Sequence, residues 1–206
     1  MSEMLLTNIT LEYIMRVILQ GGGVQMKVDP IRNRDEIRKF KEGASSLRDR
    51  VMVEVGINCG LRIGDMRKIR VKDITDNSHI NIQEEKTEKT RKVKLNHNVL
   101  EIVEEYIEKA GLGPEDYLLQ SRQGDNRAIS RVQAYRILNK MAERAGLDIK
   151  VGTHTLRKTF GFHHYRKYKD VAQLQAIFNH SSPDITLDYI GVTQAEIDRT
   201  AEEMYL

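Results

Sequence analysis

The chain has 206 residues, of which 40% are hydrophobic and 31% charged, with a formal net charge of +3 and an isoelectric point near 8.9. These values fit one soluble domain with its own core and exclude a membrane-spanning protein, because no apolar run approaches the roughly 18 residues of a spanning helix. The single cysteine, Cys59, excludes a disulfide framework within one chain and favours a cytoplasmic location.

Residues 1–25 stand apart from the rest of the chain. Residues 5–19 could form a short amphipathic helix, and the three glycines at 21–23 then act as a flexible hinge. Acidic Glu3 and the lack of a small-residue cleavage pattern are unlike a signal peptide. We therefore predict an N-terminal extension over 1–25, natural or left from cloning, and a main domain over 26–206.

The first half of this domain contains a helix and a hairpin signal. A helix begins at Ser45 or Ser46 and ends near Gly60, and a shorter helical piece follows over 65–69. HINIQ (79–83) and RKVKL (91–95) alternate with period two around the polar turn EEKTEKT, which indicates a β-hairpin.

The second half is dominated by helical periodicity, over 99–110, 130–145, 154–166 and 170–178, with Thr153 as the predicted cap of the third helix. YLL (117–119) resembles a short strand, and Ser182-Pro183 begins a helical turn that carries Tyr189. Residues 193–206 fit a last helix that begins with a capping box, and its apolar face could pack on its own domain or dock on a neighbouring copy. The sequence thus predicts a mainly α domain with a small antiparallel β-sheet, of the α+β class.

Several polar side chains stand out from this pattern, although each alone has a plain structural explanation. Arg62 lies between Leu61 and Ile63, where it either bonds local carbonyls or meets an anion, and Asp65 is placed to orient its guanidinium. His154 and Arg157 share the first turn of a helix, whose unpaired N–H groups favour an anion such as phosphate.

Three more candidates are weaker when taken one at a time. Lys86 lies at the hairpin tip, where a lysine is commonly only solvated, and His180 follows a predicted helix end. Tyr189, on a short C-terminal helix, has packing as its ordinary role.

The order of these residues along the chain resembles the catalytic domain of the tyrosine recombinases, which include phage and transposon integrases and Xer-type recombinases. One departure is the triplet Phe178-Asn179-His180 where many members have Leu-Gly-His, and asparagine tolerates the left-handed backbone that glycine adopts. The resemblance extends from about residue 30 to the C-terminus, and its matching stretches are GLRIGD (60–65), EEKTEKTRKVKL (84–95), HTLRKTF (154–160), NHSS (179–182) and ITLDYIGV (185–192).

The resemblance implies a site-specific DNA recombinase or integrase that cuts and rejoins strands through a 3′-phosphotyrosyl intermediate, without metal or ATP. It implies that Tyr189 is the nucleophile and that Lys86 is the general acid, with Lys89 as the alternative. The other implied roles are phosphate binding by Arg62 and Arg157, catalysis by His154 and His180, support of Arg62 by Asp65, and DNA contacts by Lys89, Arg91, Arg131 and Lys158.

The expected partners are double-stranded DNA and further copies of the chain, as dimers or tetramers on DNA, with no cofactor and no membrane. Two other functions stay open: a non-catalytic DNA-binding or regulatory domain on the same scaffold, and nicking and relaxing of DNA as by a type IB topoisomerase. Relatives of this kind usually carry an N-terminal DNA-clamping domain, for which the first 40 or so residues leave little room.

Overall fold

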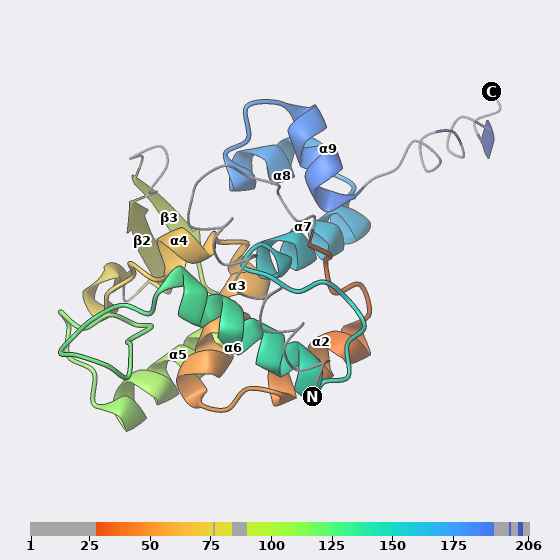
Figure 1. Ribbon diagram of the computed structural model, residues 1–206. Helices are drawn as coiled ribbons and strands as arrows, with labels where there is room; N and C mark the ends of the chain where they lie inside the picture. Colours follow the sequence, from red (N-terminus) through yellow and green to blue (C-terminus); the bar gives the residue numbers. More distant parts are fainter. Residues whose placement is uncertain (1–27, 76, 84–89, 192–197, 199–201, 204–206) are drawn as a thin grey trace, which may run out of the picture.

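The computed structural model describes residues 28–75, 77–83, 90–191, 198 and 202–203. It confirms a mainly α-helical fold with one small antiparallel sheet (Figure 1). The predictions for 1–25, Lys86 and Lys89, and nearly all of 193–206, lie outside the described residues. The elements are α2 (Arg34–Glu42), α3 (Leu47–Cys59), α4 (Ile63–Met66), η1 (Val71–Asp73), β1 (Ile74–Thr75), β2 (His79–Gln83), β3 (Thr90–Lys94), α5 (His97–Ala110), α6 (Arg131–Arg144), α7 (Thr155–Tyr168), α8 (Val171–Phe178) and α9 (Pro183–Ile190).

Helix ends follow the local chemistry of the sequence where caps are strong. The Ser46 hydroxyl accepts from the backbone N–H of Asp49 at the start of α3, and Gly60 ends that helix with φ 63°. The predicted cap of α7 was wrong: the helix begins after His154, whose side chain makes no cap bond, and the Thr155 hydroxyl accepts from Gly152 N–H instead. The short helix α4 also begins two residues before its predicted start.

The sheet contains the predicted hairpin and one strand that was not predicted. Strands β2 and β3 pair antiparallel, and Ile80, Ile82 and Leu95 are buried as the alternation indicated. The additional strand β1 is only two residues long and pairs with the start of β2. The strand-like segment 117–119 was a wrong prediction, because Tyr117 forms only an isolated bridge and the two leucines pack into the core.

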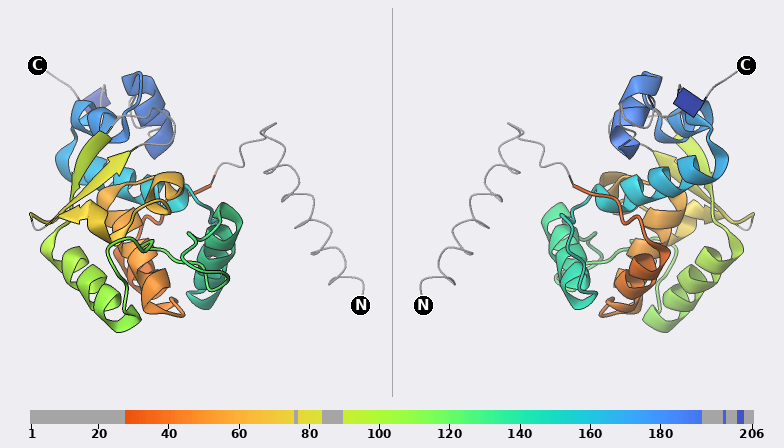
Figure 2. Two further views of the ribbon diagram at one scale, coloured as in Figure 1. Left: turned by 90° about the vertical axis from the view of Figure 1, so that its left-hand side faces the viewer. Right: turned by 90° about the vertical axis from the view of Figure 1, so that its right-hand side faces the viewer.

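The core is divided into a large cluster around α3 and a small cluster between α7, α8 and α9. Buried side chains cover nearly every face of α3, which packs against α5 and α7. The small cluster is centred on Leu174, Phe178 and Ile190, and Figures 1 and 2 show α8 and α9 together at one end of the molecule. A Cβ on Gly161 of α7 would lie 2.8 Å from Ile190 Cγ2, so glycine permits this close approach.

None of the described helices is long and apolar enough to cross a membrane.

Candidate active site

The site is built around the C-terminal end of α8. Asn179 adopts the left-handed conformation expected for it, with φ 49° and ψ 48°. Its N–H bonds to the carbonyl of Ala176, and the N–H of His180 bonds to that of Gln175, which is the pattern of a Schellman motif. The last two carbonyls of the helix, those of Ile177 and Phe178, are left to accept hydrogen bonds from elsewhere.

Arginines from three different elements bind these two carbonyls. Arg157 on α7 donates through Nη2 to the Phe178 carbonyl at 2.6 Å, and Arg62, which precedes α4, donates to the same oxygen at 3.3 Å. Arg91 on β3 donates to the Ile177 carbonyl at 2.6 Å. The negative end of the helix dipole further favours cations here. The two arginines predicted to bind phosphate are therefore brought together, although 95 positions separate them in the chain (157 − 62).

Arg157 is held on several sides. Its side chain is 1% exposed, its Nη1 donates to the Gly60 carbonyl at 2.8 Å, and its guanidinium lies 4.2 Å from the centre of the Phe178 ring. Glycine is favoured at position 60 for two reasons: its φ is positive, and a Cβ would approach the Phe160 ring to 2.6 Å. The guanidinium is thus buried and fully oriented before any ligand binds.

Asp65 lies beside Arg62, and its role in supporting that arginine stays a prediction. Its Oδ2 lies 3.8 Å from Arg62 Nη1, which is an ion-pair distance rather than a hydrogen bond, and its side chain is 2% exposed.

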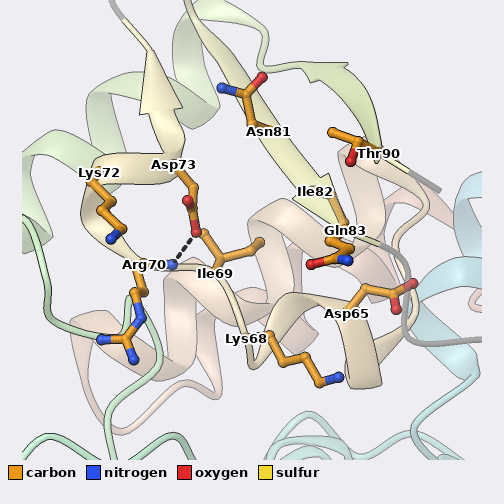
Figure 3. A pocket seen from close by; sticks show the side chains of 10 residues that line it. All are labelled: Asp65, Lys68, Ile69, Arg70, Lys72, Asp73, Asn81, Ile82, Gln83 and Thr90. Atoms are coloured by element: carbon orange, nitrogen blue, oxygen red, sulfur yellow. Dashed lines mark hydrogen bonds between the residues drawn. The ribbon is translucent and has the colours of Figure 1, made fainter. Parts of the chain in front are cut away.

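Asp65 also lines a pocket of about 540 Å³ between β2 and the α4–η1 segment. Figure 3 shows the Asp65 carboxylate at one end of this pocket and the cations Arg70 and Lys72 at the other.

The Tyr189 hydroxyl faces His154 across the gap between α9 and α7. The distance from the hydroxyl to His154 Nδ1 is 3.1 Å. Burial raises the pKa of Tyr189 to about 12, against the charges of Arg157 and Arg62 and a hydrogen bond from Arg157. The phenol is therefore neutral at pH 7 and needs a base before it can act as a nucleophile.

His154 meets the requirements for that base. Its side chain is open to solvent on one side, yet the protein around the ring lowers the pKa of His154 by desolvation, and the charges of Arg157, Lys158, Arg62 and Arg131 lower it further. A lowered pKa keeps the imidazole neutral at pH 7, so one ring nitrogen can accept a proton.

His180 completes the group. Its ring centre lies 5.4 Å from that of Tyr189 and 5.2 Å from that of Phe178, and its Nδ1 is 3.0 Å from the hydroxyl of Thr186. Thr186 carries no signal in the sequence, because it reads as an ordinary residue on the buried face of α9.

The residues predicted to contact DNA are placed differently from one another. Lys158 lies with its Nζ 5.4 Å from the centre of the Tyr189 ring, and Arg131 begins α6 close enough to affect His154. Arg91 is bound inside the protein through Nη1, at the end of α8. The DNA contacts of Arg91, Arg131 and Lys158 stay predictions. So do the DNA contact of Lys89 and the catalytic role of Lys86, because both lysines lie outside the described residues.

Sequence comparison points to one family. The sequence model described as "Phage integrase family" matches residues 33–196. A "Probable integrase/recombinase YoeC" from Bacillus subtilis (strain 168) is 41% identical over 169 residues, which cover 81% of this chain and 91% of the relative. A "Tyrosine recombinase" from Pseudothermotoga lettingae is 31% identical over 163 residues, covering 78% of this chain and 56% of the relative.

Structural comparison gives the same fold. The crystal structure of XerA recombinase has a TM-score of 0.71 at 24% identity and covers 86% of this chain and 66% of its own. A structure of XerH site-specific recombinase bound to palindromic difH substrate has a TM-score of 0.70 at 24% identity, with 87% and 54% covered. This chain thus spans most of YoeC but only part of the longer recombinases. The chain belongs to the phage integrase family and has the catalytic-domain fold of the tyrosine recombinases.

Proposed function

We propose that this protein cuts and rejoins DNA at specific sites, with Tyr189 as the nucleophile and a 3′-phosphotyrosyl bond as the intermediate. The observation that carries the proposal is the 3.1 Å contact between the Tyr189 hydroxyl and His154 Nδ1, beside two arginines that meet at one carbonyl. Membership of the phage integrase family supports it.

A phosphodiester bound at this site is activated by Arg62 and Arg157. Each guanidinium has five N–H donors in a planar fork that matches phosphate oxygens, and the bonds to the Phe178 carbonyl fix both forks in advance. Arg62, with a side chain 22% exposed, is the more accessible of the two, and Arg157 supports the charge from the protein side. Charge that builds on the nonbridging oxygens during attack is then stabilised without reorganisation.

In the chemical step, His154 takes the phenol proton and the Tyr189 oxygen forms a bond to phosphorus. The bond from phosphorus to the 5′-oxygen breaks, and that oxygen takes a proton from the general acid, for which we propose Lys86 with Lys89 as the alternative. The phosphotyrosyl bond keeps the ester energy, so a free 5′-hydroxyl can reverse the reaction. We therefore propose that neither ATP nor a metal ion takes part.

The test is a duplex nicked just 3′ of the cleaved bond, so that a short 5′-hydroxyl fragment diffuses away after cleavage. With EDTA present and ATP absent, we expect a covalent protein–DNA adduct, which transfers its DNA to an added strand with a 5′-hydroxyl. A protein that forms the adduct and relaxes a supercoiled plasmid, but never joins two duplexes, would favour the topoisomerase-like activity. Salt-sensitive DNA binding without an adduct on any site would favour the non-catalytic alternative.

We also propose that the protein self-associates on double-stranded DNA in the cytoplasm. Among structures of similar fold is a lambda integrase tetramer bound to a Holliday junction, at a TM-score of 0.64. A basic pocket of about 580 Å³, lined by Arg32, Arg34, Phe162, His163, Arg166, Lys167 and Gly191, suits the acidic C-terminal sequence from 193 to 206, from the same copy or a neighbour. Sedimentation of the protein–DNA complex, compared between the wild type and Arg166→Glu, tests the self-association. Cell fractionation tests the location.

The pH dependence of cleavage provides a separate prediction about His154. The base must be neutral, so cleavage is lost as pH falls through the pKa of His154, which lies below the usual 6.5. Lys158→Met removes one positive charge that lowers this pKa, so the acid limb of the single-turnover rate profile should move to higher pH. Lys140→Met, an exposed lysine on α6, is the control and should leave the limb in place. An unmoved limb in Lys158→Met would remove His154 from the role of base.

A further inference from the structure

The Thr186 hydroxyl is a buried polar group with a specific partner. Thr186 lies on α9 with 0% of its surface exposed, and its Oγ1 is 3.0 Å from Nδ1 of His180. A buried hydroxyl is costly to leave without a hydrogen bond, so the contact with His180 stabilises the folded site. Within the described part of the chain, no second group competes with His180 for this hydroxyl.

We propose that Thr186 is a positioning residue that selects the tautomer of His180. A hydroxyl can donate or accept, so the direction follows from the proposed role of the ring: a neutral ring that donates through Nε2 must accept at Nδ1, from the Thr186 hydroxyl. The proton lies on Nε2, and Nε2–H is the donor that His180 offers to a nonbridging oxygen of the bound phosphodiester. This inference rests on the proposed function, because it assigns the direction of one hydrogen bond in that reaction.

The main chain and the ring of His180 have different partners. Gln175 fixes the main chain of His180 on both sides, since its Nε2 donates to the His180 carbonyl at 3.1 Å and its own carbonyl accepts from His180 N–H. The main chain is thereby anchored to α8, but it sets neither the ring torsion nor the position of the ring proton. The hydroxyl of Thr186 contacts the ring itself, at Nδ1.

The same contact links His180 to the nucleophile. Thr186 precedes Tyr189 by three residues, which is about one helical turn, so α9 carries both the phenol and the group that orients the histidine. A shift of α9 therefore moves Tyr189 and reorients His180 together.

The experiment compares Thr186→Val, which keeps the shape and removes the hydroxyl, with Thr186→Ser, which keeps the hydroxyl. In the full chain with ¹⁵N-labelled histidine, NMR at pH above the titration of the ring should show the proton of His180 on Nε2 in the wild type and in Thr186→Ser. In Thr186→Val we expect a mixture of the two tautomers. Signals are assigned by their loss in His180→Gln.

Kinetics provide the second readout. Single-turnover cleavage at saturating DNA should fall roughly 10- to 100-fold in Thr186→Val, which is the loss typical when a group that orients a metal-ligating histidine is removed. The affinity for DNA should be unchanged, and Thr186→Ser should be close to wild type. Wild-type protein with the proton on Nδ1, or Thr186→Val with an unchanged tautomer, would overturn the inference. Equal loss of rate in the Ser and Val variants would also overturn it, because packing alone would then explain the effect. The NMR result holds or fails even if the protein never cleaves DNA, which separates this inference from the proposed function.

Discussion

Tyr189→Phe should abolish the covalent protein–DNA adduct while leaving DNA binding and the fold intact. The substitution removes one oxygen, whose contacts are with His154 and Arg157, so the free energy of unfolding should change by no more than about 1 kcal/mol. The adduct is measured by denaturing gel on the nicked duplex, and the affinity for intact DNA by retardation at fixed salt.

The matched control is Tyr168→Phe, which makes the same chemical change on α7. Tyr168 is 55% exposed and is turned to solvent rather than toward His154, so its variant should form the adduct at the wild-type rate. An adduct that persists in Tyr189→Phe would place the nucleophile on another residue and would refute the assignment of Tyr189 as the nucleophile.

Arg157→Ala should have the largest combined effect on rate and on stability. Loss of one preorganised donor to the transition state costs roughly 10²–10³ in rate. The substitution also leaves the Gly60 carbonyl unpaired and opens a cavity beside Phe178, so the free energy of unfolding should fall by about 2–4 kcal/mol. Single-turnover cleavage and urea unfolding measure the two losses.

Arg62→Ala separates the two effects. Arg62 is partly exposed and its bond to the Phe178 carbonyl is longer, at 3.3 Å, so we expect a comparable loss of rate with a much smaller loss of stability. Arg157→Lys keeps the charge but cannot bridge the carbonyls of Gly60 and Phe178, and it should stay slow. Cleavage at the wild-type rate in either alanine variant would remove that arginine from the phosphate site.

The parts of the fold that could be predicted from the sequence are those determined by neighbouring residues. The helix start at Ser45 or Ser46, the helix end near Gly60 and the alternation of the hairpin are local, and the structure confirms each, with Ser46 as the cap. Helix α2 was not predicted, because RDEIRKFKE contains only two apolar residues and only Phe40 is buried. Strand β1 is too short to show any alternation.

The candidate site shows a second limit of prediction from the sequence. Its ionisable residues were found by type and order, but their meeting point is the main-chain carbonyl of Phe178, and a carbonyl has no signature in a sequence. Arg62 reaches that oxygen from 116 positions away. Thr186 was missed for a related reason, since a threonine on a buried helix face is common and only its distance to His180 distinguishes it.

The small cluster of Leu174, Phe178 and Ile190 has a consequence for how the protein loses activity. Helices α8 and α9 pack on α7 through this cluster, which is separate from the large core around α3. A unit with so few buried contacts can open as a cooperative subdomain at a lower free energy than global unfolding. Such an opening would release the Phe178 carbonyl from Arg62 and Arg157 and the Ile177 carbonyl from Arg91, and it would withdraw Tyr189 at the same moment. Because the α8–α9 part of the candidate site can open in this way, we expect activity to be lost at a lower temperature than that of global unfolding.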